Sequence, residues 1–456
     1  MQIKRLLKVS YLTIGILAII LLITNCNKPK PDDTEPVPTG PKTYTGNLTN
    51  PDEATLKMIQ DDKYEVIAGD VVFSFNNITD FNYLKNIKEI SGDFTIEYCE
   101  NLLNFEGLEQ LHAIRGNFTV KVNHKLENFN GLSLLDTISK NFSIVSNNQL
   151  IEIEGLPSLK VIQRSLIIQF QNELINLSGF ETLEEIGTDL ILFSNNKKTS
   201  FYGLERLKTI WGTISLSGDN TFKDFYGLKS LESLHGGLFI SNYQNLESLN
   251  GLGGLKYIAG NIEIINNPML REIGGLNGLD SIKGNIQIEL NDTLMQINGF
   301  NNIELIGANL YINDNDNLVV LNGFKKIHII SGKLRITDNN YLLNLSGLEN
   351  FEISGNGVTI LKNKRLVEIS SLSGLRIIKE KLFISDNYQL TNLNGLEGLT
   401  FIDGNVTIIN NTELMDFCSM QNLFITDAIT GNVRIDGNKF NPMPNEIISG
   451  NCSLNE

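Results

Sequence analysis

The chain has few of the residues from which catalytic and metal centres are usually built. Its 456 residues include four histidines and four cysteines, and the histidines are His112, His124, His235 and His328. The motifs HExxH and CxxC, a phosphate-binding loop and a nucleophile elbow are absent. We therefore expect a protein that is not an enzyme and that carries no cofactor.

Positive charge is also scarce. The sequence has 37 lysines and arginines against 52 aspartates and glutamates, which gives a formal net charge of -15. Nucleic acids and anionic membranes attract proteins through an excess of positive charge. The composition therefore argues against nucleic acid as a partner, and against attraction of the folded part to anionic lipid.

Proline is rare outside one stretch near the N-terminus. Six of the ten prolines lie between residues 29 and 51, and only Pro157 and Pro268 interrupt the long middle of the chain. A proline-rich stretch with few apolar residues forms an extended spacer without a core of its own. We expect a disordered tether over residues 26–55.

The N-terminal stretch, residues 1–25, is typical of a secretion signal. Basic residues precede an apolar run over residues 11–23, which is too short to favour a spanning helix. The end of this run at Cys26 resembles the lipobox of bacterial lipoproteins, in which the cysteine is lipidated. Acidic residues soon after it resemble the surface-export signal of Bacteroidetes lipoproteins. These resemblances imply an outer-membrane lipoprotein at the cell surface, with an ordinary signal peptide as the alternative.

The dominant feature of the sequence is a repeat with a period of 24. A Gly-Leu or Gly-Phe pair recurs at this spacing from Gly107 to Gly395 without insertion, and Ser371 is the only exception to the glycine. A period this regular is typical of a solenoid, in which one coil cannot bury its apolar side alone.

The unit itself favours β structure. Ile286 and Ile288 alternate with polar residues, as in a short strand, and the other apolar residues of the unit recur at every third position. A unit of this length is too short for a strand, a packed helix and their loops. The pattern predicts an all-β, β-helical solenoid of about fourteen coils over residues 83–417, roughly 65 Å long at the usual strand spacing.

One column of the repeat is rich in asparagine. Its members are Asn123, Asn147, Asn195, Asn267, Asn291, Asn315, Asn339, Asn363, Asn387 and Asn411, and its exceptions are Gln171, Asp219 and Tyr243. We expect a buried ladder, in which each side chain satisfies backbone groups of its own and the adjacent coil. The alternative is the ordinary preference of asparagine for turns. Cys99 shares the column and is expected to be structural.

The ends of the repeat region are irregular, as the end units of solenoids usually are. Residues 56–82 predict an N-terminal cap with a short helix, and residues 418–456 predict a C-terminal cap. Cys418 and Cys452 are positioned to close a disulfide over the last coil in an exported protein, with two free thiols as the alternative.

The outer face of the main predicted sheet carries apolar side chains. Candidate contacts for a ligand on this face are Ile167, Ile191, Phe193, Phe239, Tyr311 and Phe383. An exposed sheet rich in such residues suggests a contact surface. The alternative is that these residues simply suit strands.

One acidic cluster is a weak candidate for Ca²⁺. Asp314 and Asp338 share a column in adjacent coils, and Asp292 and Asp316 line a second column two positions away. Oxygen ligands gathered in this way suit Ca²⁺. Solvated turn residues are the stronger interpretation, since the Gly- and Asp-rich repeat of calcium-filled β-rolls is absent.

The full repeat resembles that of receptor L domains. The shared pattern is Gly-Leu-x-x-Leu-x-x-Ile-x-Gly-Asn-Leu-x-Ile-x-x-Asn-x-x-Leu over residues 66–438. The resemblance implies a right-handed β-helix related to leucine-rich repeats, with recognition on an outer β-face. We therefore expect a surface protein that binds a protein or glycan. The alternatives are a carbohydrate-active enzyme on a β-helix and a purely structural spacer.

Overall fold

The computed structural model describes residues 40–195, 197, 200–218 and 223–454. Residues 41–456 belong to one compact unit. The predicted signal peptide, Cys26 and residues 26–39 of the predicted tether lie outside the described residues. Within the part of the chain that is described, no helix is long and apolar enough to cross a membrane.

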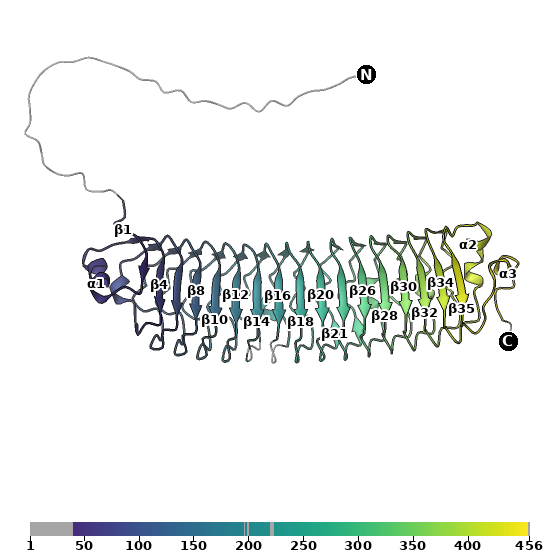
Figure 1. Ribbon diagram of the computed structural model, residues 1–456, viewed down its shortest axis with the longest axis horizontal. Coiled ribbons are helices and arrows are strands. Elements are labelled where there is room, and N and C mark those ends of the chain that lie inside the picture. Colours follow the sequence, from purple (N-terminus) through teal and green to yellow (C-terminus); the bar gives the residue numbers. More distant parts are fainter. Residues whose placement is uncertain (1–39, 196, 198–199, 219–222, 455–456) are drawn as a thin grey trace, which may run out of the picture. The chain divides into compact units, whose positions relative to one another are not determined.

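The unit is a stack of coils whose strands form two long parallel sheets (Figure 1). The 16-stranded sheet A is built of very short strands: β1 (Thr43–Thr45), β3 (Val66–Ala68), β5 (Glu89–Ile90), β7 (Ala113–Ile114), β9 (Thr137–Ile138), β11 (Val161–Ile162), β13 (Glu185–Ile186), β15 (Thr209–Ile210), β17 (Ser233–Leu234), β19 (Tyr257–Ile258), β22 (Ser281–Ile282), β25 (Leu305–Ile306), β27 (Ile329–Ile330), β29 (Ile353–Ser354), β31 (Ile377–Ile378) and β33 (Phe401–Ile402).

Sheet B is the larger sheet. Its strands are β2 (Leu48–Thr49), β4 (Val71–Ser74), β6 (Phe94–Glu97), β8 (Phe118–Lys121), β10 (Phe142–Val145), β12 (Leu166–Gln169), β14 (Leu190–Phe193), β16 (Ile214–Ser217), β18 (Leu238–Ser241), β20 (Ile262–Ile265), β23 (Ile286–Glu289), β26 (Leu310–Asn313), β28 (Leu334–Thr337), β30 (Val358–Leu361), β32 (Leu382–Ser385), β34 (Val406–Ile409) and β35 (Val433–Asp436). Their pairings run in one line from β2 to β35. The all-β solenoid predicted from the period of the repeat is therefore confirmed.

Helical structure is short and lies mainly at the ends. The helices are α1 (Glu53–Asp61), α2 (Gln421–Ile425) and α3 (Pro444–Ile448), with 3-10 turns η1 (Asn82–Leu84), η2 (Tyr226–Leu228), η3 (Asn322–Phe324), η4 (Ser370–Leu372) and η5 (Cys418–Met420). A third, two-stranded sheet joins β21 (Glu272–Ile273) to β24 (Gln296–Ile297). This small helical content agrees with the expectation of little helix.

The stack is longer than the predicted fourteen coils, since sheet A alone has 16 strands. The first coils are one residue shorter than the period, because Leu48 is in register with Val71, and Val71 with Phe94. The last coil is longer than the period, because Val406 is in register with Val433. These coils were left out of the predicted count because their lengths depart from the period of the repeat. The predicted end of the tether at residue 55 is also wrong, because β1 already pairs with β3.

The core is a set of apolar columns that continue from coil to coil. In one coil Ile286, Ile288, Leu294 and Ile297 are all fully buried, and the equivalent residues of the other coils repeat this arrangement. Burying one such side chain contributes roughly 1.5–3 kcal/mol. Each coil therefore depends on its neighbours for most of its stability.

The asparagine ladder is present. Asn291 donates its backbone N–H to Oδ1 of Asn315 at 3.2 Å, and its Nδ2 donates to the carbonyl of Ile264 at 2.9 Å. The same bonds recur along the column, and Gln171 substitutes by accepting from the N–H of Asn147. The prediction of a buried ladder is confirmed, because these side chains are fully buried and bond to neighbouring coils.

Cys99 occupies the same column and is fully buried. Its backbone N–H donates to Oδ1 of Asn123 at 2.9 Å, and burial raises the pKa of its thiol to about 11. A thiol with such a pKa has almost no thiolate at neutral pH. The structure therefore agrees with a structural role for Cys99.

Two backbone columns adopt left-handed conformations. One follows sheet B and precedes the asparagine column; Val122 has φ 54 there, a strained value for a β-branched residue. The other is the glycine column, where a Cβ on Gly131 (φ 103) would lie 2.0 Å from the carbonyl oxygen of Phe105. Ser371 is tolerated in this column because it lies within η4, where φ is not positive.

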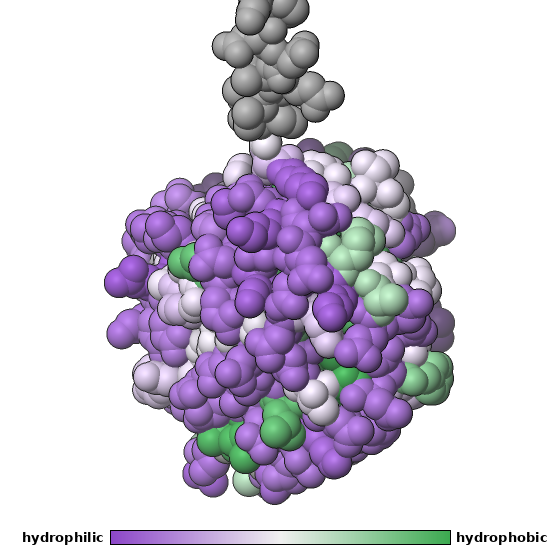
Figure 2. Space-filling model, turned by 90° about the vertical axis from the view of Figure 1, so that its left-hand side faces the viewer, coloured by the Kyte–Doolittle hydropathy of each residue, from purple (hydrophilic) through white to green (hydrophobic). Residues whose placement is uncertain are grey.

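Both ends of the core are covered. Helix α1 buries Ile59 at the N-terminal end and α3 buries Ile447 at the other. Cys418 and Cys452, the predicted pair, are joined by a disulfide. Figure 2 shows that the N-terminal end is mainly hydrophilic, with only separate apolar spots. The N-terminal cap thus gives that end of the stack a mainly polar surface.

Candidate functional site

The outer face of sheet B carries all six predicted contact residues. Ile167 lies on β12, Ile191 and Phe193 lie on β14, and the list is completed by Phe239 on β18, Tyr311 on β26 and Phe383 on β32. Phe193 is 38% exposed, and the others are half-buried between the side chains of adjacent strands. Because strands lie about 4.8 Å apart, neighbouring side chains on this face cover one another in part.

Three of the six residues form one surface with a residue that the sequence did not single out. Ile167 pairs directly with Ile191 across β12 and β14. Phe170 follows β12, is 46% exposed and packs edge-to-face on Phe193 with ring centroids 5.3 Å apart. We call Ile167, Phe170, Ile191 and Phe193 the apolar patch. Its four side chains offer a contiguous hydrophobic contact surface.

The other three predicted residues have polar partners in their own column. Phe239 lies between Ser215 and Glu263 in the register of the strands. Tyr311 lies between Gln287 and Arg335, and Phe383 lies between Thr359 and Thr407. Diagonally across the strands, Ile265 lies near Phe239, and Leu361 and Ile409 lie near Phe383. Apolar side chains therefore recur along the face within polar surroundings, and the apolar patch is one such group.

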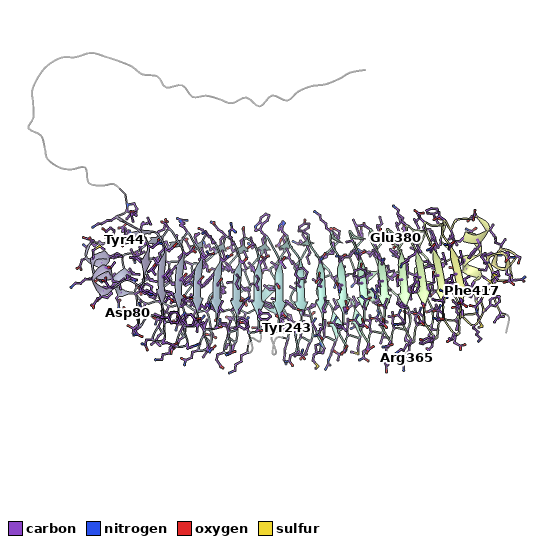
Figure 3. The ribbon with its side chains drawn as sticks, in the orientation of Figure 1. Tyr44, Asp80, Tyr243, Arg365, Glu380 and Phe417 are labelled. Carbon is purple, nitrogen blue, oxygen red and sulfur yellow. A yellow bond between two sulfur atoms is a disulfide. The ribbon has the colours of Figure 1, made fainter. Side chains whose placement is uncertain are left out.

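A second surface with apolar side chains runs along the turns that follow the asparagine column. Met295, Leu343 and Val367 occupy one column there and are 51%, 43% and 42% exposed. Beside them, the guanidinium of Arg365 lies 4.1 Å from the ring centre of Tyr341. Figure 3 shows Arg365 on the edge of the solenoid opposite Tyr44 and Glu380. The sequence pattern did not reveal this surface, because alternation identifies outward side chains in strands only.

A groove of about 420 Å³ lies within this second surface. It is lined by Arg271, Thr293, Met295, Asn317, Val319 and Tyr341. Its volume falls in the range of small-molecule sites, but those sites enclose most of their ligand between apolar walls. This groove mixes charged, amide and apolar side chains on an open edge, which suits a shallow contact.

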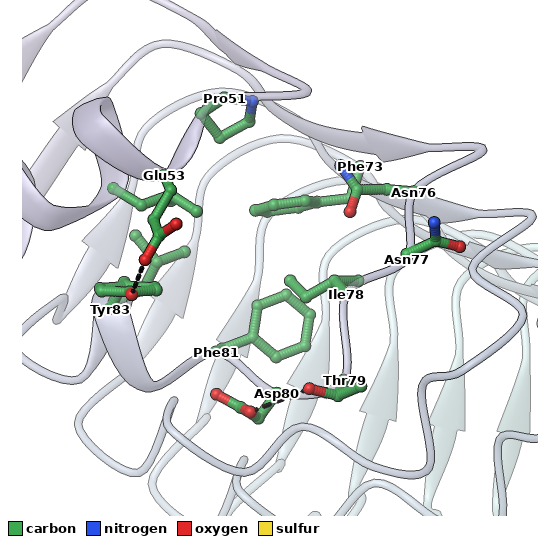
Figure 4. Close-up of a pocket in the computed structure, with 12 residues that line it drawn as sticks. Pro51, Glu53, Phe73, Asn76, Asn77, Ile78, Thr79, Asp80, Phe81 and Tyr83 are labelled. Carbon is green, nitrogen blue, oxygen red and sulfur yellow. Dashed lines mark hydrogen bonds between the residues drawn. The ribbon is translucent and has the colours of Figure 1, made fainter.

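A third hollow lies in the N-terminal cap and measures about 300 Å³ (Figure 4). Phe73 and Phe81 form its floor, and Tyr83 closes one side by donating to a carboxylate oxygen of Glu53 at 2.9 Å. That bond and the charge of Glu53 raise the pKa of Tyr83. The hollow lies where the cap helix meets the first coils, so its apolar floor is an extension of the core.

The acidic cluster has no metal-binding arrangement. Burial raises the pKa of Asp314, and the charges of Asp338, Glu289 and Asp316 raise it further. Asp316 accepts a hydrogen bond from Nδ2 of Asn340. Among the described residues, no group of three or more His, Cys, Asp or Glu side chains is placed to hold a metal ion. The charges of these neighbouring carboxylates thus disfavour ionisation of Asp314, and Asp292 is not among them.

No family model matches this chain, and no curated protein matches it. A solved structure, the crystal structure of a TLR13–ssRNA13 complex, is similar over 83% of this chain and 82% of that one, with 13% identity and a TM-score of 0.20. A TM-score this low supports no argument about function. The chain is a parallel β-solenoid repeat protein by its own sheet topology.

Proposed function

We propose that this protein is a non-enzymatic recognition protein whose solenoid binds a protein or glycan partner on the outer face of sheet B. The observation that carries the proposal is the apolar patch, in which Phe170 and Phe193 are 46% and 38% exposed. Exposed aromatic side chains in contact with each other are typical of the anchors of binding surfaces. The apolar character of the patch favours a protein as its partner.

Rigidity supports the same function. The patch residues come from strands held by pairings on both sides and by a core with continuous apolar columns. A preformed surface loses little conformational entropy when it binds. The excess of acidic residues also favours a soluble surface that repels nucleic acid.

We further propose attachment to the outer membrane through a lipid on Cys26, with the solenoid presented at the cell surface. This proposal rests on the sequence around Cys26 and on its proline-rich spacer. Metabolic labelling with an alkyne fatty acid should mark the wild-type chain and leave Cys26→Ser unmarked. Equal labelling of both chains would refute lipidation at this residue.

The binding proposal is tested by screening the purified protein against arrays of extracellular proteins and glycans. A saturable partner should bind at least tenfold more weakly to the Phe170→Ala/Phe193→Ala variant, because aromatic anchors usually contribute about 2 kcal/mol or more. Phe383→Ala removes a phenylalanine of the same sheet that lies outside the apolar patch, and it should leave binding unchanged. Failure to find any partner would favour the spacer alternative, and turnover of an arrayed polysaccharide would favour the enzyme.

A further inference from the structure

The only tryptophan of the chain lies at the corner between the two sheets. Trp211 directly follows β15 of sheet A and is 52% exposed. Indole is the largest side chain and gains much from burial, so solvated tryptophans are enriched where a partner covers them. Trp211 takes no part in the core and none in the apolar patch.

The indole is held in a fixed orientation. Its Nε1 donates to a carboxylate oxygen of Glu185 at 2.8 Å, and its ring stacks on His235 with centroids 4.2 Å apart and planes 16° apart. His235 in turn contacts Tyr257, with ring centroids 5.3 Å apart. Trp211 and His235 occupy equivalent positions of adjacent coils, so the backbone ladder sets their spacing. An aromatic surface fixed in this way loses little entropy on binding.

Small and hydroxylated side chains surround the rings. The coils on either side carry Gly187 and Ala259 at the positions equivalent to Trp211 and His235. In sheet A the outward row next to the rings reads Glu185, Thr209, Ser233 and Tyr257, each paired with the next. The aromatic pair therefore rises above its neighbours and is bordered by hydrogen-bonding groups.

We infer that Trp211, His235, Tyr257 and Glu185 form a binding platform for a neutral glycan. One face of a pyranose ring presents C–H groups, which stack on an aromatic ring, while its hydroxyl rim hydrogen-bonds to carboxylate, hydroxyl and imidazole groups. His235 covers one face of the indole, so the open face of Trp211 is the one turned towards the coil of Gly187, a position without a side chain. The sugar ring stacks on this face, beside the carboxylate of Glu185 that bonds to the indole.

Charge distinguishes this ligand from other stacking ligands. Nucleic acid bases also stack on aromatic side chains, but their binding depends on positive charge that follows the phosphates. Here the formal net charge is -15 and a carboxylate holds the indole. The platform lies on sheet A, so this inference stands independently of the patch on sheet B.

The test uses the intrinsic fluorescence of the protein, because Trp211 is its single tryptophan. The purified chain is titrated with hexasaccharides of β-1,4-glucan, β-1,3-glucan, β-1,4-mannan and chitin. At least one hexasaccharide should change the tryptophan emission, and this change should level off as the sugar concentration rises. By calorimetry the same hexasaccharide should bind roughly tenfold or more weakly to Trp211→Ala. Glu185→Gln weakens the hydrogen bond that fixes the indole. It should therefore reduce the affinity for the hexasaccharide by a smaller factor than Trp211→Ala does.

Matched variants separate this site from the rest of the surface. Tyr226→Ala removes an aromatic side chain that is 61% exposed elsewhere, and it should bind the sugar like the wild type. Phe170→Ala/Phe193→Ala should also bind it normally. The inference is overturned if no hexasaccharide alters the emission, or if Trp211→Ala retains wild-type affinity with an unchanged melting temperature. Equal binding of a dT6 oligonucleotide would overturn the glycan assignment.

Discussion

Replacement of Asn147 by alanine should destabilise the protein strongly, whereas the same change at the adjacent Asn148 should not. Oδ1 of Asn147 accepts hydrogen bonds from the backbone N–H and the Nδ2 of Asn123, at 2.9 and 3.2 Å. Its own Nδ2 donates to the carbonyl of Val120 at 3.0 Å. Asn147 is fully buried, whereas Asn148 is exposed. The two substitutions therefore differ in environment and not in chemistry.

The size of the effect follows from the groups that lose their partners. In Asn147→Ala the buried N–H of Asn123 loses its acceptor and the carbonyl of Val120 loses this donor. Each such group costs about 1–3 kcal/mol, so the free energy of unfolding should fall by roughly 2–6 kcal/mol. A surface change such as Asn148→Ala usually stays within about 0.5 kcal/mol.

Two measurements check this reasoning. Urea denaturation gives the loss of stability for each variant, and native-state hydrogen exchange reports it locally, since coils of a solenoid can open separately. The backbone amide hydrogen of Asn123 should exchange faster in Asn147→Ala than in the wild type. In Asn148→Ala it should exchange at the wild-type rate. Similar stability of the two variants, with the Asn123 amide still protected, would refute a stabilising ladder.

Two further perturbations test the cap and the acidic cluster. Reduction of the Cys418–Cys452 disulfide, whose sequence separation is 34, should lower the stability of the last coils by about 3–4 kcal/mol; unaltered urea denaturation under reductant would contradict this. The raised pKa of Asp314 means that its carboxylate destabilises the folded state at neutral pH, and that this cost disappears as the pH falls through the raised pKa. Asp314→Asn should therefore raise the melting temperature slightly at pH 7 and leave it unchanged at about pH 2, below the usual aspartate pKa.

Much of the fold could be predicted from the sequence because the coils are in register. Residues one period apart lie side by side, so a column such as Asn291, Asn315 and Asn339 is also a set of contacts. The strand patterns at residues 71–75 and 432–435 were visible in the sequence, and both form strands. They lay outside the predicted fourteen coils, because coils shorter or longer than the period displace the columns.

The surfaces were harder to predict than the core. Phe170 lies outside the strand pattern, and only its left-handed backbone, φ 55, brings it against Phe193. The pairing of Trp211 with His235, in contrast, was available in the sequence, because they stand one period apart. It was missed because alternation marks outward side chains only within strands, and each of these two residues follows a strand. Phe239 is separated from Ile191 in its column by Ser215, so the extent of the patch depended on a single small residue.

The two caps also decide whether one molecule stays separate from the next. Every coil presents the same row of backbone donors and acceptors to its neighbour, so an uncovered end would be a template for the end of another molecule. At one end helix α1 packs over the first coils, and at the other the disulfide-closed segment bonds to the last coil, where the N–H of Phe417 donates to the carbonyl of Cys452. A chain that lost either cap would gain a route to end-to-end polymerisation into filaments.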